Sequence, residues 1–387
     1  MLNRGVAKSI VVLMTWLLSG LIKVMMKATY FCYGIHPREN LHKLPVRSLL
    51  RFKCVSKLWK TLIDEPHFRM THLNHAKNDK NSQNFLFYQL CPMEAIFSIY
   101  CCPLSSATLA EDVRELDFPL IVEPRFCQVY CCCDGLVIIT VYDNLAECHR
   151  LLLWIPSTRE SIVFPTPKLS LNGICCLGMS FDSNTGDYKI LRILKDRNQG
   201  RKARGEILAL KSGSWRKIDE HPDVFQYILL GMHSLAYIQG AFHWVGFSRN
   251  YFMVLFNISH EVYGEIPLPE QISMSYIDIG VSELEGMLCA YSNVHHQGEN
   301  TFKLWMMKDY GVQESWNALF CITDPNIDIP VPKYVFANGE VLFWCIYYGR
   351  AENSYWTQNG PFTLLPRGLR QNGFVFIESL ISPRLLT

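Results

Sequence analysis

Cysteine and histidine side chains that could bind a metal ion gather in one part of this sequence. Cys127, Cys131, Cys133, Cys148 and His149 lie close together along the chain. Zinc sites usually combine two closely spaced ligand pairs, and no CxxC pair followed by a second such pair occurs here. The stretch is also typical of a strand, in which successive side chains point to opposite faces. We therefore expect cysteines in a core or at a sheet edge, and no metal site.

Carboxylates and histidines that could act as general acids or bases are scattered. Three aspartates fall in predicted turns, where a carboxylate accepts backbone hydrogen bonds: Asp182, Asp187 and Asp309. His243 lies beside Trp244 in an aromatic strand, which favours a core or edge position. His295 and His296 form a weak chelating pair in a predicted loop, so a solvated loop is favoured. Without a phosphate-binding, HExxH, GxSxG or GxGxxG motif, the sequence predicts no catalytic residue and no cofactor.

The composition is that of a folded protein without a dominant charge. The 387 residues are 49% hydrophobic and 13% aromatic, and 37 basic side chains face 35 acidic ones. This balance gives no support to nucleic-acid binding through the field of the whole chain. The fifteen cysteines are odd in number and often adjacent, which favours reduced thiols over a disulfide framework. We expect the cytoplasm, the nucleus or both.

An apolar run near the amino terminus leaves a second location open. Residues 9–22 are hydrophobic and follow Arg4 and Lys8, and residues 24–26 extend the run beyond Lys23. The uninterrupted run is shorter than the ~20 residues that span a bilayer. Membrane association through residues 9–26 is therefore a possible but disfavoured alternative to a buried helix, or to a segment that was not selected for function.

Residues 44–76 predict an amphipathic helix or two short consecutive helices. Pro45 suits a helix start, and the helical pattern closes at Pro66. Apolar residues recur at three- and four-residue spacing: Val55, Leu58, Trp59, Leu62 and Ile63. Basic residues occupy the other face: Lys43, Arg47, Arg51, Lys53, Lys57 and Lys60. This basic face could be solvated, bind an acidic protein or bind nucleic acid, and the last is disfavoured because no aromatic–basic interleave is present.

The remainder of the chain predicts repeated short strands. Residues 77–84 are polar and indicate a linker. Strands of branched and aromatic residues then recur, and they begin at or near five glycines: Gly135, Gly178, Gly240, Gly286 and Gly339. Most of these spacings are close to the ~40–50 residues of a propeller blade. We expect a β-propeller with five visible blades and a plausible sixth, and a β-sandwich is the alternative.

Two sets of residues resemble a known family. The helical stretch resembles the second half of a plant F-box at Leu44-Pro45, Ser48 to Phe52, Cys54 to Lys57, Trp59, Leu62-Ile63, Pro66 to Phe68 and His72 to Asn74. The strands resemble the F-box-associated interaction domain at Cys133 to Leu136, Trp154 to Arg159, Gly178 to Ser183, Asp187 to Lys189, Ser212 to Trp215, Gly240 to Trp244, Trp305 to Gly311 and Glu314 to Trp316. Residues 29–43 depart from the first half of an F-box.

The resemblance implies a multidomain α + all-β protein, in which a short helical F-box module precedes a kelch-like, β-propeller-like repeat domain. The implied segments are an atypical hydrophobic start (1–40), a partial F-box (41–76), the linker (77–84) and the F-box-associated domain (85–387). The implied interface for a Skp-type adaptor, and through it a cullin ubiquitin ligase, is Leu44, Pro45, Leu49, Leu50, Cys54, Val55, Trp59 and Leu62.

Three functions remain open at this point. The chain is expected to hold a protein substrate for a ubiquitin ligase whose catalytic groups lie in other subunits. A second possibility is a ligase-uncoupled interaction protein, perhaps anchored to a membrane, and an enzyme built on a propeller is least expected. The substrate cannot be read from the predicted loops at 141–149, 194–205, 246–251 and 291–300.

Overall fold

A computed structural model describes most of the chain outside its amino terminus, and the chain divides into two compact units at Asp79/Lys80. The described residues are 41–91, 96–104, 113–117, 127–143, 148–164, 173–196, 203–219, 235–247, 250–272, 277–296, 299–323, 330–345, 354–357, 360–362 and 369–382. The apolar run at 9–26 lies outside them. Among the described helices, none is both long and apolar enough to cross a membrane.

The first unit contains three described helices, α3 (Val46–Val55), α4 (Lys57–Asp64) and α5 (Pro66–Asn78). Pro45 precedes α3 as its N-cap residue, and Pro66 opens α5, where the missing N–H of proline costs no helical hydrogen bond. Ser56 has extended backbone angles and separates α3 from α4. The prediction of two short consecutive helices between Pro45 and Pro66 is thus confirmed. The expected close at Pro66 was wrong, because Pro66 opens a third helix, and α5 reaches into the segment that was predicted to be a linker.

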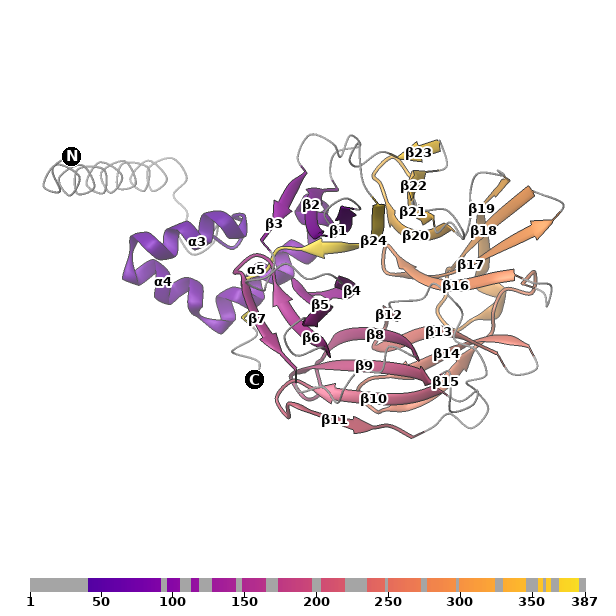
Figure 1. The fold of residues 1–387 in the computed structure, drawn as a ribbon, viewed down its shortest axis with the longest axis horizontal. Helices are drawn as coiled ribbons and strands as arrows, with labels where there is room; N and C mark the ends of the chain where they lie inside the picture. Colours follow the sequence, from indigo (N-terminus) through magenta and orange to yellow (C-terminus); the bar gives the residue numbers. More distant parts are fainter. Residues whose placement is uncertain are drawn as a thin grey trace, which may run out of the picture. The chain divides into compact units, whose positions relative to one another are not determined.

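The second unit begins with a 3-10 turn (Lys80–Ser82) and contains six four-stranded antiparallel sheets among its described residues (Figure 1). Sheet 1 joins β24 (Leu369–Ile377), β1 (Gln83–Cys91), β2 (Ile96–Pro103) and β3 (Arg114–Leu116). Sheet 2 contains β4 (Cys127–Cys133), β5 (Leu136–Asp143), β6 (Cys148–Ile155) and β7 (Glu160–Val163). Sheet 3 contains β8 (Gly173–Asp182), β9 (Asp187–Asp196), β10 (Ala203–Ala209) and β11 (Ser214–Lys217).

The other three sheets repeat the same arrangement. Sheet 4 contains β12 (Ala236–Ile238), β13 (Ala241–Phe247), β14 (Tyr251–Asn257) and β15 (Val262–Ile266). Sheet 5 contains β16 (Ile277–Leu284), β17 (Met287–His296), β18 (Glu299–Met307) and β19 (Trp316–Thr323), with a 3-10 turn at Gln313–Ser315. Sheet 6 contains β20 (Pro330–Val335), β21 (Val341–Cys345), β22 (Ser354–Thr357) and β23 (Gly360–Phe362).

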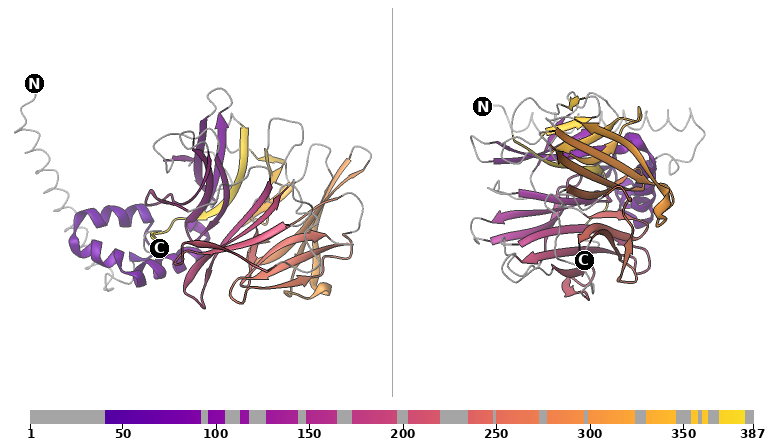
Figure 2. Two further views of the ribbon diagram at one scale, coloured as in Figure 1. Left: turned by 60° about the horizontal axis from the view of Figure 1, so that its bottom comes forward. Right: turned by 90° about the vertical axis from the view of Figure 1, so that its right-hand side faces the viewer.

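The sheets are the blades of a closed propeller (Figures 1 and 2). Each blade places one strand innermost, and contacts between these strands run in the order β24, β4, β8, β12, β16 and β20 around the axis. The ring closes because β24, from the end of the described chain, pairs with β1 from its start, with Gln83 opposite Ile377. The propeller prediction is confirmed, and radial packing rules out the β-sandwich.

The apolar core lies between neighbouring blades, as radial stacking requires. One cluster joins blades 3, 4 and 5, and another joins blades 1 and 2. Two more join blade 6 to blade 1 and blade 5 to blade 6. Trp154, Trp244 and Trp305 are buried within these interfaces or strands, whereas Trp215 and Trp316 are only partly buried.

Tight turns after the innermost strands explain most of the glycine repeat. Gly135, Gly240, Gly286 and Gly339 all have φ near +80°, a backbone region that favours glycine. Gly178 is different, because it lies inside β8 without a positive φ and faces the Phe242 ring of the next blade. The turn of blade 3 uses Gly186 instead, which makes the repeat nearly even at about 50 residues. The assignment of Gly178 as a blade start was therefore wrong.

Two further expectations are corrected or refined. Residues 291–296, predicted as loop, continue strand β17, with His295 opposite Asn300 and His296 opposite Glu299.

The described cysteine side chains form no disulfide; seven are buried, and Cys54 and Cys321 are exposed. The predicted burial is thus confirmed for seven of the eleven cysteines whose side chains are described.

Candidate functional site

The helical module has its own apolar core, to which one predicted interface residue belongs. Leu49 and Ile63 are completely buried, and Val46, Phe68 and Leu73 surround them with little exposure. His72 in α5 closes this core through a 3.0 Å hydrogen-bond contact between Nε2 and the carbonyl oxygen of Leu44. Leu49 therefore supports the fold of the module and offers no free surface.

Asp64 joins the three helices by charge. Its carboxylate lies 2.5 Å from Lys53 Nζ of α3 and 2.6 Å from Arg69 Nη2 of α5. Burial would raise the pKa of Asp64, but the hydrogen bonds and charges of Lys53 and Arg69 outweigh it and lower that pKa. Asp64 thus neutralises Lys53 on the basic face. It forms no ion pair with the other described basic residues of α3 and α4.

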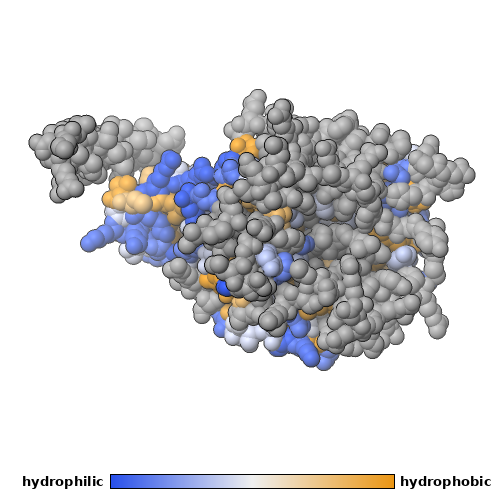
Figure 3. All heavy atoms as spheres, viewed as in Figure 1, coloured by the Kyte–Doolittle hydropathy of each residue, from blue (hydrophilic) through white to orange (hydrophobic). Residues whose placement is uncertain are grey.

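The outer face of α3 and α4 carries an exposed apolar patch (Figure 3). Val55 is 47% exposed and Leu58 is 77% exposed. Phe52 and Trp59 pack against each other with ring centroids 5.6 Å apart, and both are partly exposed. We call Phe52, Val55, Leu58 and Trp59 the α3–α4 patch. Apolar groups gathered in this way are typical of a surface that binds another protein.

The predicted interface residues divide into three groups. Leu49 is buried; Leu44, Leu50, Trp59 and Leu62 are partly exposed; and Pro45, Cys54 and Val55 are exposed. Val55 and Trp59 are brought into the α3–α4 patch. Their role in adaptor binding stays a prediction.

Phe52 and Leu58 of the α3–α4 patch are not among the predicted interface residues, and the more exposed of the two is Leu58. Its spacing from Val55 and Leu62 placed it on an apolar stripe that was expected to be buried by its own module. The break at Ser56 instead distributes that stripe over two helices, so only Ile63 is fully buried.

Exposed cations lie on the same two helices as the α3–α4 patch. Arg47, Arg51, Lys57 and Lys60 are all exposed, and α3 and α4 have no acidic residue in their first turns. An apolar centre with a positive surround fits a partner whose own apolar surface is bordered by acidic residues. These positive charges would increase the rate at which such a partner associates, and they would add less to the affinity than the apolar contacts do.

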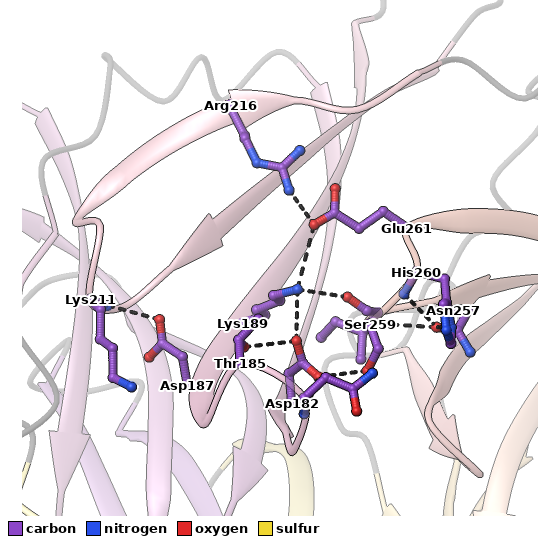
Figure 4. A network of polar contacts seen from close by, with 12 residues as sticks. Asp182, Thr185, Asp187, Lys189, Lys211, Arg216, Asn257, Ser259, His260 and Glu261 are labelled. Carbon is purple, nitrogen blue, oxygen red and sulfur yellow. Dashed lines mark hydrogen bonds and ion pairs between the residues drawn. The ribbon is translucent and has the colours of Figure 1, made fainter.

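On the propeller, the predicted acidic candidates turn out to be structural (Figure 4). Lys189 of β9 has a side chain only 7% exposed, and its Nζ lies 2.8 Å from Asp182 Oδ2 and donates to the Ile258 carbonyl oxygen at 3.0 Å. Ser259 Oγ also donates to Asp182, at 2.6 Å. Since residues 258 and 259 belong to the β14–β15 turn, this network ties blade 3 to blade 4.

The network extends outward through Glu261. This carboxylate lies 3.5 Å from Lys189 Nζ and pairs with Arg216 of β11, which lowers the pKa of Glu261 despite its partial burial. Asp187 accepts the backbone N–H of Lys211 at 3.0 Å. Both Asp182 oxygens and Oδ2 of Asp187 accept hydrogen bonds within the fold, so the predicted turn role of Asp182 and Asp187 is confirmed and extended.

His243 is a satisfied core residue, as predicted. Its side chain is completely buried, with Nδ1 3.4 Å from the Ala236 carbonyl oxygen and Nε2 2.7 Å from the Tyr310 hydroxyl. Burial lowers the pKa of His243 to about 4, so the ring stays neutral at physiological pH.

Burial raises the pKa of Cys131 to about 12, which keeps this thiol protonated and unreactive. Among the described side chains, no group of three His, Cys, Asp or Glu residues is arranged to hold a metal.

The propeller axis contains a cavity of about 290 Å³. Residues from all six innermost strands line it, including Cys132, Met179, Tyr237, Ser282, Lys333 and Phe374. Small molecules and protruding side chains commonly bind in such concave, partly apolar sites. We call this cavity the axial channel.

A small helical module with an exposed apolar patch, followed by a six-bladed propeller whose described polar groups serve the fold, defines a binding protein. Two family models match the chain: the F-box domain over residues 41–71 and the F-box associated beta propeller domain over residues 98–360. The chain therefore belongs to the family of F-box proteins with an F-box associated β-propeller domain, whose members are non-catalytic adaptors.

Relatives and solved structures agree with this assignment. The F-box/kelch-repeat protein At3g23880 of Arabidopsis thaliana is 26% identical over 357 residues, which cover 89% of this chain and 94% of that protein. The F-box protein CPR1 of the same plant is 23% identical over 310 residues, covering 73% and 71%. TolB from Acinetobacter baumannii aligns with a TM-score of 0.50 and 12% identity over 80% of this chain and 72% of TolB, a likeness of fold alone.

Proposed function

We propose that this protein is the substrate-recognition subunit of a Skp–cullin–F-box ubiquitin ligase. In this proposal the helical module (predicted at 41–76) binds a Skp-type adaptor, and the propeller domain (predicted at 85–387) holds a protein substrate. Transfer of ubiquitin takes place on other subunits, and the contribution of this chain is to raise the local concentration of substrate lysines.

The observation that supports this proposal best is the α3–α4 patch. Leu58 and Val55 are among the few large apolar side chains left exposed in the described residues, and they fall inside the segment matched by the F-box model. Apolar side chains at the centre of an interface usually carry much of the binding free energy. The exposed cations on the same helices would steer an acidic partner toward the patch.

The direct test is co-purification of the full-length chain with a plant Skp-type adaptor. We expect wild type to bind, and Val55→Asp/Leu58→Asp to lose about 2 kcal/mol or more of binding free energy, because charges would be buried in an apolar contact. Val262→Asp is the matched control, since Val262 is 55% exposed but lies on the propeller strand β15. Equal binding by all three proteins would refute this interface.

Absence of adaptor binding even by wild type would support the alternative, a ligase-uncoupled interaction protein. In that case, the function of the propeller would be to bind a protein partner without the adaptor. Residues 29–40, which depart from the usual F-box pattern, lie outside the described part of the chain, and residues 41–43 begin the F-box match. If this departure removes part of the adaptor contact, adaptor binding is weaker and the propeller is unchanged.

We propose the cytoplasm, the nucleus or both as the site of action, and the free thiols of the described cysteines support a reducing compartment. Membrane fractionation of the full-length chain beside a chain that starts at Leu41 tests this location. Recovery of both proteins in the soluble fraction is expected. Loss of the full-length chain to the membrane fraction, but not of the shorter one, would support anchoring through residues 9–26.

A further inference from the structure

The axial channel contains one cationic side chain among its lining residues, Lys333 of β20. Its Nζ lies 5.6 Å from the centroid of the Trp344 ring and 5.3 Å from that of Phe374. Aromatic faces at these distances attract a cation. Lys333 is therefore placed between the inner strands of two neighbouring blades, with its ammonium group held over aromatic surfaces.

No carboxylate of the described chain neutralises Lys333. Glu283 is the acidic residue that lines the same channel, but its Oε1 accepts the backbone N–H of Gly286 at 2.5 Å, and no ion pair joins it to Lys333. Burial alone lowers the pKa of Lys333 to about 7. Lys333 is only partly buried, but an ammonium group partly withdrawn from water without a counter-ion is still unfavourable, and aromatic rings compensate only part of that cost.

We propose that the axial channel binds a carboxylate group, for which Lys333 supplies the counter-ion. A single cation matches a monoanion, whereas a phosphate would require several further N–H donors. The apolar walls formed by Met179, Val281 and Phe374 would receive the hydrocarbon part of the same ligand. The carboxylate comes from an acidic side chain of a bound protein or from a small organic acid.

Binding of a carboxylate is coupled to the protonation of Lys333. The anion stabilises the ammonium form and raises the pKa of Lys333, so the affinity decreases as the pH rises above about 7. The other titratable groups that line the channel are Glu283, Tyr237, Tyr291 and the cysteines 131–133. Burial raises the pKa values of Tyr237, Cys131 and Cys132, which keeps these groups neutral in that pH range.

The test measures how fast Lys333 of the full-length protein is acetylated by trace acetic anhydride, with exposed Lys217 as the internal reference. Near pH 6, below the pKa of about 7, saturating phenylacetate should slow the acetylation of Lys333 about tenfold, the effect of a one-unit rise in pKa, while uncharged phenylacetamide should not. A short peptide, acetyl-Gly-Phe-Asp-Gly-amide, and its Asn counterpart form the second pair of probes. Mass spectrometry of the Lys333 peptide provides the measurement.

Protection by either acid supports the carboxylate site, and the more effective acid identifies the source. Protection by the peptide alone points to an acidic side chain of a protein, and protection by phenylacetate alone points to a small organic acid. The proposal is overturned if neither acid protects Lys333, if the amides protect equally, or if phenyl phosphate protects more strongly than phenylacetate.

Two variants separate binding at Lys333 from a general change in the fold. Lys333→Met should remain folded, as judged by thermal unfolding, and should lose phenylacetate binding in calorimetry; retained binding would overturn the proposal. Lys333→Arg stays charged, so its affinity for phenylacetate should persist and lose its dependence on pH above neutrality. Both variants should co-purify with the Skp-type adaptor as wild type does, so failure of the carboxylate site and failure of the adaptor interface are distinguishable.

Discussion

Single residues in this protein divide sharply between those that hold the blades together and those left free to bind. Asp182 and Lys189 belong to the first kind, because their side chains are 0% and 7% exposed and face each other across a 2.8 Å contact. Leu58 and Lys333 belong to the second, since the fold leaves Leu58 exposed and Lys333 without a carboxylate. Neither could be predicted from its neighbours in sequence: the exposure of Leu58 depends on the break at Ser56, and the surroundings of Lys333 come from distant strands.

Breaking the buried Asp182–Lys189 pair should destabilise the propeller. Lys189→Met leaves the Asp182 carboxylate buried without its cation, and we expect a loss of about 3–5 kcal/mol in the free energy of unfolding, measured with urea. Lys80→Met is the control, because the Lys80–Glu285 pair is largely exposed and screened by solvent, so that its loss should change the free energy of unfolding far less. Similar losses for the two variants would contradict this role of the network.

Asp182 should also make the propeller sensitive to acid. Burial alone would raise its pKa, but hydrogen bonds from Lys189, Ser259 and Thr185 outweigh burial and hold the pKa well below the usual 3.8. This contribution to stability is therefore present above the unfolded pKa and disappears as the pH falls through the lower folded pKa. Urea unfolding between about pH 5 and pH 2 should show a steeper loss for wild type than for Asp182→Asn. Parallel curves would exclude Asp182 as a cause.

At the scale of elements, the strands with a regular pattern were predictable and the contacts between them were not. Residues 136–142, 151–155 and 302–307 were predicted as strands from their branched and aromatic side chains, and all three lie in the middle of blades. The repeat assignment was wrong at Gly178, because a tertiary contact, and not a turn, requires glycine at this position. A Cβ atom there would lie 2.6 Å from the Phe242 ring of the next blade. Local spacing cannot distinguish such a glycine from one in a turn.

Two turn glycines with the same backbone angles should respond differently to alanine. Gly135 and Gly240 have φ of +80° and +81°. A Cβ atom added at Gly135 would lie 2.3 Å from Ser379 Cβ, whereas a Cβ atom added at Gly240 would have no neighbouring atom within 4 Å. Gly240→Ala should cost about 1–2 kcal/mol through its left-handed backbone alone. Gly135→Ala should cost roughly 1–3 kcal/mol more through overpacking, measured as urea midpoints. Equal midpoints would show that Ser379 yields without cost.

At the scale of the whole propeller, stability depends on one closure between β1 and β24. The sequence predicted the repeat and left the sixth blade only plausible, because sheet 1 is assembled from strands at opposite ends of the domain. A chain that stops after residue 368 lacks β24 and exposes the edge of β1. We expect this chain to lose its cooperative thermal transition, whereas a chain that stops after Ser382 retains β24 and should unfold cooperatively. Cooperative unfolding of the shorter chain would make β24 dispensable.

The same closure has a consequence during synthesis. At about 5–20 residues per second, ribosomes need roughly a quarter of a minute to a minute to make the chain between β1 and β24. Throughout that interval β1 has no inner neighbour, and an unpaired strand edge readily pairs with other chains. Production of this protein is therefore expected to depend on chaperones that cover nascent chains, and a slow codon or a stalled ribosome late in the message would prolong the period in which β1 is unprotected.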